Sequence, residues 1–184
     1  MPKKVAITSD GPYVGATTVA RELAGEPYWY THVSMSNYLI AAFADMRGLD
    51  YDEVVDNKEF YRAELQEFGP RYDRDPAWVR EMVNDHRTSE SLIVEKVRTD
   101  EQATELLNMG FVLVKLVISE PERVRRAGSR GVSPSHLSDI LRSPAERGLV
   151  RVKPHITLNA EAQPYWLARI IDANVSTLPA ALRR

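Results

Sequence analysis

The sequence KKVAITSDGPYVGATT occupies residues 3–18 and changes character twice along its length. Lys3–Thr8 is a short apolar segment typical of a buried strand, and residues 9–15 are rich in turn formers. From Ala16 onward the apolar residues recur at helical spacing until Gly25, which predicts the end of the helix. A strand, a glycine-containing turn and a helix in this order predict a βα unit whose turn lies at the carboxyl end of the strand.

This turn matches in part the pattern Gly-x-x-x-x-Gly-Lys-[Ser/Thr] of P-loops, in which main-chain amides and a helix N-terminus face a phosphate group. Gly15 and Thr17 keep the second glycine and the hydroxyl residue, whereas Asp10 replaces the first glycine and Ala16 replaces the lysine. Because amide donors do not depend on the side chain, we expect the turn to bind ATP, with Thr17 reaching Mg²⁺. The predicted cofactor-binding residues are Asp10, Gly11, Gly15, Ala16, Thr17 and Thr18. An ordinary βα turn without a ligand is the alternative interpretation.

The alanine at position 16 has a chemical consequence. In a P-loop the lysine neutralises charge on the β- and γ-phosphoryl oxygens while the phosphoryl group is transferred. Removing one well-placed electrostatic donor typically lowers a rate by ~10²–10³. Nucleotide binding could therefore survive in this chain where turnover does not.

Four more strand-like segments follow the first. They span residues 28–35, 91–97, 111–118 and 155–158. Helical patterns separate them, and a final helix is predicted over residues 164–173. Five strands joined by helical crossovers predict an α/β fold of the P-loop NTPase type, with a parallel five-stranded sheet flanked by helices. The ligand crevice is expected at the carboxyl ends of the strands.

Caps and breaks predict where the helices begin and end. Ser36 or Asn37 caps the helix after the second strand, and Asp100 caps the helix after the third. Between them, Gly69-Pro70 ends one helix and Asp75-Pro76 begins another. Further helix starts are predicted at Glu120-Pro121, Ser133-Pro134 and Ser143-Pro144.

Composition limits the classes of function. With 184 residues, 43% of them hydrophobic, the chain can bury one core, which predicts a single domain over residues 1–175 followed by a loose tail over 176–184. The absence of cysteine excludes disulfides and Cys-ligated metal sites. A net charge of -2 provides no overall attraction to nucleic acid. Because no segment suits a signal peptide or a membrane span, we expect a cytoplasmic protein without a membrane partner.

Several blocks of sequence resemble the deoxynucleoside monophosphate kinases of phages and bacteria, a branch of the P-loop kinases. In order, the blocks are Val5–Leu23, Gly48-Leu49-Asp50, Leu65-Gln66-Glu67-Phe68-Gly69, Asp75-Pro76-Ala77-Trp78 and Ile93-Val94-Glu95-Lys96-Val97-Arg98. The resemblance implies Mg²⁺-dependent transfer of the γ-phosphate of ATP to a deoxynucleoside monophosphate. It also implies a helical acceptor-binding region over about residues 36–88 and a short basic lid over about residues 123–135. The substrate-binding residues that it implies are Asn37, Gln66, Arg71 and Trp78.

The last block departs from the family pattern, which places an aspartate near Mg²⁺ and the phosphates. Lys96 stands at the aspartate position, and a carboxylate appears one residue earlier at Glu95. Glu95 is therefore predicted to act in catalysis and, with Thr17, to bind the metal. Arg98 keeps the arginine of the block and is predicted to be catalytic. Lys96 is predicted to be catalytic on the hypothesis that it returns the cation missing at Ala16. A solvated lysine at the end of a strand is the alternative.

Arginines supply the remaining positive charge. In the region that corresponds to the acceptor phosphate site lie Arg62, Arg71 and Arg74. The basic stretch after Glu120-Pro121 contains Arg123, Arg125, Arg126 and Arg130. The resemblance implies that Arg126 and Arg130 are catalytic residues of a lid that closes over the phosphoryl group and excludes water. For both groups of arginines, a solvated helix face is the alternative.

Other functions stay open at this level. A related kinase could act on a modified base within DNA, which would make DNA the partner in place of a free nucleotide substrate. The chain could instead be a non-catalytic nucleotide-binding or interaction protein. Ala16 could also be an engineered change in an active enzyme, although Asp10 and Lys96 argue against this as the whole explanation. The self-association state is open, with a homodimer among the alternatives.

Overall fold

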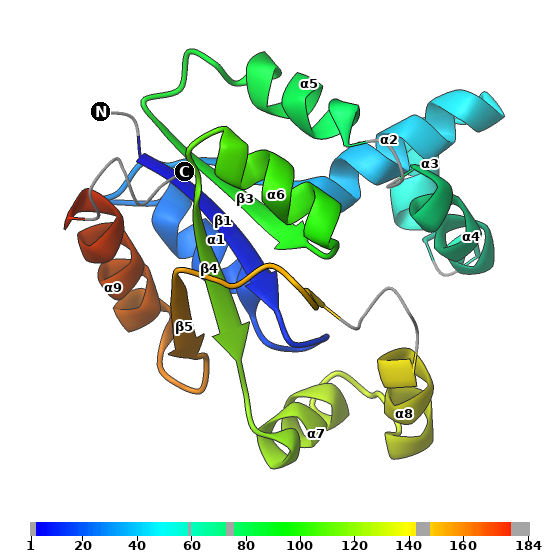
Figure 1. The fold of residues 1–184 in the computed structure, drawn as a ribbon. Helices are drawn as coiled ribbons and strands as arrows, with labels where there is room; N and C mark the ends of the chain where they lie inside the picture. The colour runs from blue at the N-terminus through cyan, green and yellow to red at the C-terminus, as the bar shows by residue number, and fades with distance from the viewer. Residues whose placement is uncertain (1–2, 59, 73–75, 143–147, 178–184) are drawn as a thin grey trace.

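The computed structural model of the protein describes residues 3–58, 60–72, 76–142 and 148–177 (Figure 1). Five parallel strands form one sheet in the order β2-β3-β1-β4-β5. The strands are β1 (Lys3–Ser9), β2 (Thr31–Ser34), β3 (Ser91–Val97), β4 (Val112–Val117) and β5 (Ile156–Asn159). The parallel five-stranded sheet predicted from the sequence is confirmed.

Helices cover both faces of this sheet (Figure 1). One face carries α1 (Ala16–Ala24) and α9 (Pro164–Thr177), and the other carries α5 (Ala77–Asp85) and α6 (Asp100–Asn108). A third cluster of buried residues belongs to α2 (Met35–Arg47), α3 (Tyr51–Asp56) and α4 (Arg62–Tyr72). At the carboxyl end of β4 lie α7 (Glu120–Gly128) and α8 (Pro134–Arg142).

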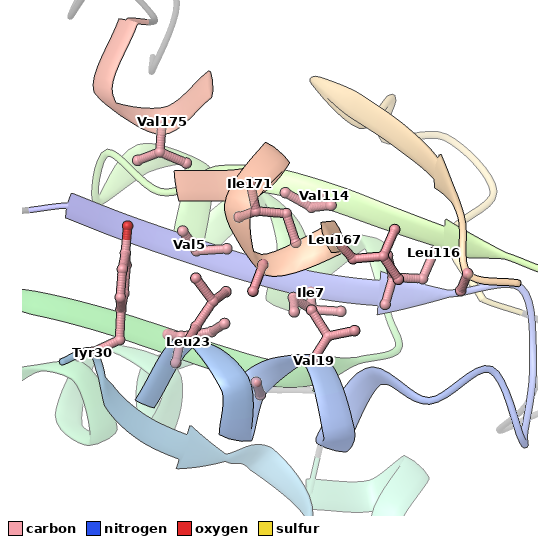
Figure 2. Close-up of a cluster of buried hydrophobic side chains, with 14 of the residues drawn as sticks. Val5, Ile7, Val19, Leu23, Tyr30, Val114, Leu116, Leu167, Ile171 and Val175 are labelled. Carbon is pink, nitrogen blue, oxygen red and sulfur yellow. The ribbon is translucent and has the colours of Figure 1, made fainter. Parts of the chain in front are cut away.

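Side chains of the central strand alternate between the two core clusters. Val5 and Ile7 pack with Leu23 of α1 and Ile171 of α9 (Figure 2), whereas Ala6 belongs to the cluster under α5 and α6. Because both faces of β1 are buried, the strand reads as a continuous apolar run rather than as an alternation of apolar and polar residues. The turn after β1 consequently opens at the carboxyl edge of a rigid sheet.

The second strand is shorter than the predicted span of 28–35. The main-chain amides of Tyr28 and Trp29 both donate to the carbonyl of Gly25, which makes this segment a turn. Trp29 has φ 54° and leaves 65% of its side chain exposed, so it cannot belong to a buried strand. The prediction made the strand too long because it relied on aromatic and β-branched residues, and these residue types also occur in such a turn.

The predicted helix end at Gly69-Pro70 is wrong, because α4 continues through it to Tyr72. Aromatic packing holds the last turn in place. Phe68 lies 5.6 Å from Phe43 of α2 between ring centroids and stacks on Tyr72 at 5.3 Å. Tertiary contacts of this kind outweigh the hydrogen bond that a proline removes from a helix interior.

Two caps also differ from the prediction. Thr99, rather than Asp100, caps α6 through a capping box with Gln102. The Asp100 carboxylate instead accepts hydrogen bonds from the main-chain amides of residues 150–152. Ser34, rather than Ser36 or Asn37, precedes α2.

Other predicted boundaries are extended or fall outside the described residues. The last helix runs to Thr177 rather than ending at 173, and Val175 is fully buried in the first core cluster. Asp75 and Ser143-Pro144 lie outside the residues that the structure describes. Within the described residues, every helix is too short or too polar to cross a membrane.

Two neighbouring isoleucines test which face of α9 packs on the sheet. We expect Ile171→Ala to lower the free energy of unfolding by about 2–5 kcal/mol, since it removes a fully buried side chain and leaves a cavity. The matched control is Ile170→Ala, because 40% of Ile170 is exposed and the loss should be below about 1 kcal/mol. Urea unfolding of both variants measures the difference, and equal losses would contradict the assigned face of α9.

Candidate nucleotide-binding site

The loop between β1 and α1 has the backbone geometry of an anion-binding nest. Gly11, Tyr13 and Gly15 have φ angles of 144°, 62° and 96°. Gly15 precedes α1 without a side-chain cap, and its carbonyl accepts the first helical hydrogen bond, from Val19. Within the described residues, the amides of Gly15, Ala16, Thr17 and Thr18 donate no hydrogen bond. Four free donors at the positive end of a helix form a site for a phosphate group.

Arg126 of α7 binds this loop and the segment after β5. Arg126 donates to the Val14 carbonyl at 2.8 Å and to the Ala160 carbonyl at 2.7 Å. Its Nε donates to Glu122 Oε1 at 2.7 Å. Hydrogen bonds from Arg125 and Arg126 lower the pKa of Glu122 to about 2, so this carboxylate stays ionised. Arg126 therefore connects α7, the loop and the segment after β5.

Arg123 makes a second contact with the loop, in the interior. Its guanidinium donates to the Pro12 carbonyl and forms an ion pair with Asp10 at 2.7 Å, with only 7% of the Arg123 side chain exposed. A Cβ atom added to Gly11 would lie 3.0 Å from Arg123 Nη1, so the guanidinium would have to shift, and the φ of 144° also favours glycine here. Asp10, which replaces the first glycine of the P-loop pattern, is thus one half of a buried anchor.

These contacts orient the peptide planes of the loop. A trans peptide is planar, so its N–H points away from its C=O. Since the carbonyls of Pro12 and Val14 bind the arginines of α7, the amides of Tyr13 and Gly15 point away from α7. We refer to Arg123 and Arg126 together as the α7 clamp. The sequence analysis placed both arginines in a lid but missed their contact with loop carbonyls.

Thr17 and Glu95, the two residues predicted to bind the metal, contact each other directly. Thr17 Oγ1 donates to Glu95 Oε2 at 2.7 Å, and Glu95 is 1% exposed at the carboxyl end of β3. Burial raises the pKa of the Glu95 carboxyl, but His32, the positive charge of Lys96 and the hydroxyl of Thr17 outweigh it. The pKa of Glu95 is therefore lower than its ordinary value, and the group is a carboxylate at neutral pH.

The residues around this pair fit Mg²⁺ bound together with phosphate oxygens. Ser34 pairs with Glu95 across the sheet, and Ser34 Oγ is buried without a hydrogen-bond partner in the described part of the chain. No group of three or more His, Asp or Glu residues is gathered in the described residues. Thr17 and Glu95 would thus hold the ion from one side, with phosphate oxygens and water completing its preferred six ligands.

A pocket of about 210 Å³ opens beside the loop. The loop residues Tyr13–Gly15 form one wall, Arg126 and Arg130 form another, and Ala160 and Leu167 contribute small or apolar surface. Arg130 lies over the Tyr13 ring at 5.6 Å. Arginine planes and apolar side chains beside a phosphate site suit the base and sugar of a nucleotide. The sequence analysis did not identify the alanine of the segment after β5, because only the fold brings it to the loop.

The predicted acceptor residues are spread over three helices that follow β2, namely α2, α4 and α5. Asn37 and Gln66 are exposed on α2 and α4, and Arg71 lies near the end of α4. Trp78 is only 8% exposed and packs in the second core cluster, 5.1 Å from Tyr72 between ring centroids. A substrate-binding role for these residues stays a prediction.

The sequence analysis named four other arginines, which are Arg62, Arg74, Arg98 and Arg125. Arg98 is exposed just beyond β3, and its main-chain amide donates to Gln102. Arg62 begins α4, and Arg125 is exposed and bound to Glu122. Arg74 lies outside the described residues. Catalytic roles for Arg98, Arg126 and Arg130 stay predictions, although Arg126 and Arg130 do border the pocket.

Comparisons with known proteins agree on the fold. No protein-family model matches the sequence, and no curated protein matches it. The structure is similar to shikimate kinase from Acinetobacter baumannii in complex with shikimate, with a TM-score of 0.57 and 16% identity over 97% of each chain. It is also similar to a candidate kinase from Chloroflexus aurantiacus, with a TM-score of 0.52 and 19% identity over 96% of this chain and 98% of that one. The chain therefore has the fold of the P-loop kinases, whereas nothing among these matches singles out the deoxynucleoside monophosphate kinases.

The α7 clamp is tested by two adjacent arginines. We expect Arg126→Gln to weaken binding of ATP–Mg²⁺ by about 10–100-fold, because a charged hydrogen bond worth about 1.5–3 kcal/mol no longer fixes the Val14 carbonyl. Arg125→Gln is the control, since the exposed Arg125 binds only Glu122 in the described residues. Calorimetric titration measures both affinities, and unchanged binding by Arg126→Gln would contradict the clamp.

The lowered pKa of Glu95 predicts a pH dependence of stability. A carboxyl whose pKa is lower in the folded state stabilises that state above its ordinary pKa of about 4.3, and the stabilisation disappears as the pH falls through the folded value. We expect native stability to decline more steeply below about pH 5 than that of Glu95→Gln. Urea unfolding at stepped pH measures both slopes, with Glu101→Gln, an exposed carboxyl on α6, as the control. Parallel slopes for native protein and Glu95→Gln would exclude a lowered pKa.

Proposed function

We propose that this protein is a P-loop phosphotransferase that moves the γ-phosphoryl group of ATP to a deoxynucleoside monophosphate. The observation that carries the proposal is the set of free amides from Gly15 to Thr18 next to the Thr17–Glu95 pair. Free amides would bind phosphate oxygens, and the pair would hold Mg²⁺ against them. The similarity to kinase structures supports this reading through the fold alone.

The nucleotide has a defined orientation in this proposal. Its phosphates bind over the N-terminus of α1, and its base and sugar occupy the pocket between the loop, α7 and the segment after β5. The acceptor then approaches from the helices after β2, which lie across the carboxyl edge of the sheet from α7 (Figure 1). Asn37, Gln66, Arg71 and Trp78 are the proposed acceptor contacts.

A phosphate acceptor suits the chemistry of the described residues. One oxygen of the acceptor monophosphate forms a bond to the γ-phosphorus while the bond from that phosphorus to the β–γ bridging oxygen breaks, releasing ADP. At neutral pH this acceptor oxygen carries little proton, because the second pKa of a phosphate monoester is about 6. No side chain must remove a proton, and Glu95, the buried carboxylate nearest the loop, remains free to hold Thr17. A hydroxyl acceptor such as shikimate would need a proton acceptor in addition.

Product formation tests the proposal. We expect ATP–Mg²⁺ to bind and one of the deoxynucleoside monophosphates to be converted to its diphosphate with equal release of ADP. Thr17→Val keeps the shape of the side chain without the hydroxyl, and its turnover should fall by about 10²-fold because one electrostatic contact is lost. Calorimetry measures ATP binding, and chromatography of the nucleotides measures transfer.

The same measurements distinguish the other functions. Conversion of shikimate but of no nucleotide would reject the proposed acceptor. ATP binding without transfer to any free acceptor would indicate a binding module, unless duplex or single-stranded DNA becomes phosphorylated. Absence of ATP binding in both the native protein and Ala16→Lys would exclude nucleotide chemistry altogether.

A further inference from the structure

Lys96 interrupts the pairing of the two central strands. β1 and β3 are in register from Lys3 and Ser91 to Ile7 and Glu95, but Thr8 then pairs with Val97. Lys96 is therefore the extra residue of a β-bulge, and it has φ 64°. A positive φ is unfavourable for a residue with a side chain, and bulges of this kind redirect side chains next to active sites.

The bulge changes which side chains of β3 lie on each face of the sheet. Before it, Ile93 packs in the cluster under α1 and α9, Val94 packs in the opposite cluster, and Glu95 reaches Thr17 of α1. Regular alternation would turn Val97 toward α1, yet Val97 packs with Val94 in the opposite cluster. Lys96 is thus inserted at the carboxyl end of β3 without displacing either Glu95 or the core.

The other cations beside the loop are already engaged. Arg123 binds Asp10 and Pro12, and Arg126 binds Glu122, Val14 and Ala160. Arg130 lies over the Tyr13 ring. Lys96 is partly exposed and forms no hydrogen bond or ion pair within the described residues. Lys96 directly follows Glu95 in the bulge, and its positive charge helps lower the pKa of that carboxyl.

We propose that Lys96 supplies the catalytic cation that a P-loop normally carries on the lysine replaced here by Ala16. The inference rests on the proposed function. The strand bulge places an ammonium beside Glu95, where it meets the transferring phosphoryl group from the β3 side rather than from the start of α1. There it stabilises the negative charge that the phosphoryl oxygens carry during transfer.

Removal of the ammonium gives a direct test, because the bulge provides a variant that should fold. Glycine accepts a positive φ, so Lys96→Gly should unfold at the same temperature as the native protein or at a higher one. Its turnover should nevertheless fall by ~10²–10³ while its affinity for ATP–Mg²⁺ changes less than about 10-fold. Lys96→Arg keeps the charge and should retain more turnover than Lys96→Gly. Lys153→Met removes an exposed lysine elsewhere and is the matched control.

A second-site change tests whether the two positions share one task. Lys96→Gly combined with Ala16→Lys should recover turnover to within about 10-fold of the native protein, because the cation returns at the usual P-loop position. Native-level turnover in Lys96→Gly would overturn the inference and leave the proposed function standing. Equal losses in Lys96→Gly and Lys96→Arg would also overturn it, since they would show a role for shape rather than charge. A native protein without turnover would overturn both.

Discussion

The anion site depends on how the guanidinium groups of α7 hold the carbonyls of Pro12 and Val14. The loop lacks the usual P-loop lysine, and two of its peptide planes are oriented by side chains from another helix. Arg123 and Arg126 do this through the planarity of the peptide group. The amides of Tyr13 and Gly15 consequently face away from α7, whereas the pocket lies between the loop, α7 and the segment after β5.

The aspartate that replaces the first glycine of the P-loop pattern belongs to the same set of contacts. Asp10 stands where a glycine is usual, and it is the ion-pair partner of the buried Arg123. A buried guanidinium without a counter-ion would be strongly destabilising, so the aspartate and the arginine require each other. Glycine is favoured at position 11, since a side chain there would displace the Arg123 guanidinium and the backbone has a positive φ. The loop is therefore anchored through Asp10 and through the carbonyls that Arg123 and Arg126 bind.

Much of the fold follows from local pattern. The apolar run of β1, the turn formers after it and the helical spacing from Ala16 predicted the βα unit, and the same reasoning located the five strands. The errors share a cause. Pro70 lies inside α4, where Phe68 packs against Phe43 of α2, and Asp100 binds main-chain amides some fifty residues away instead of capping α6. Contacts between distant segments leave no trace in a local window.

The amino-acid sequence was sufficient to predict a strand, a glycine-containing turn and a helix at the start of the chain, with a hydroxyl at Thr17 and a carboxylate at the end of another strand, because each depends on residue type and short spacing. Only the folded chain decided that Glu95 is the partner of Thr17, that Arg123 and Arg126 bind loop carbonyls, and that Lys96 sits in a bulge. Register, burial and peptide orientation arise when strands and helices far apart in sequence pack together. They are properties of the sheet as a whole, and no single segment encodes them.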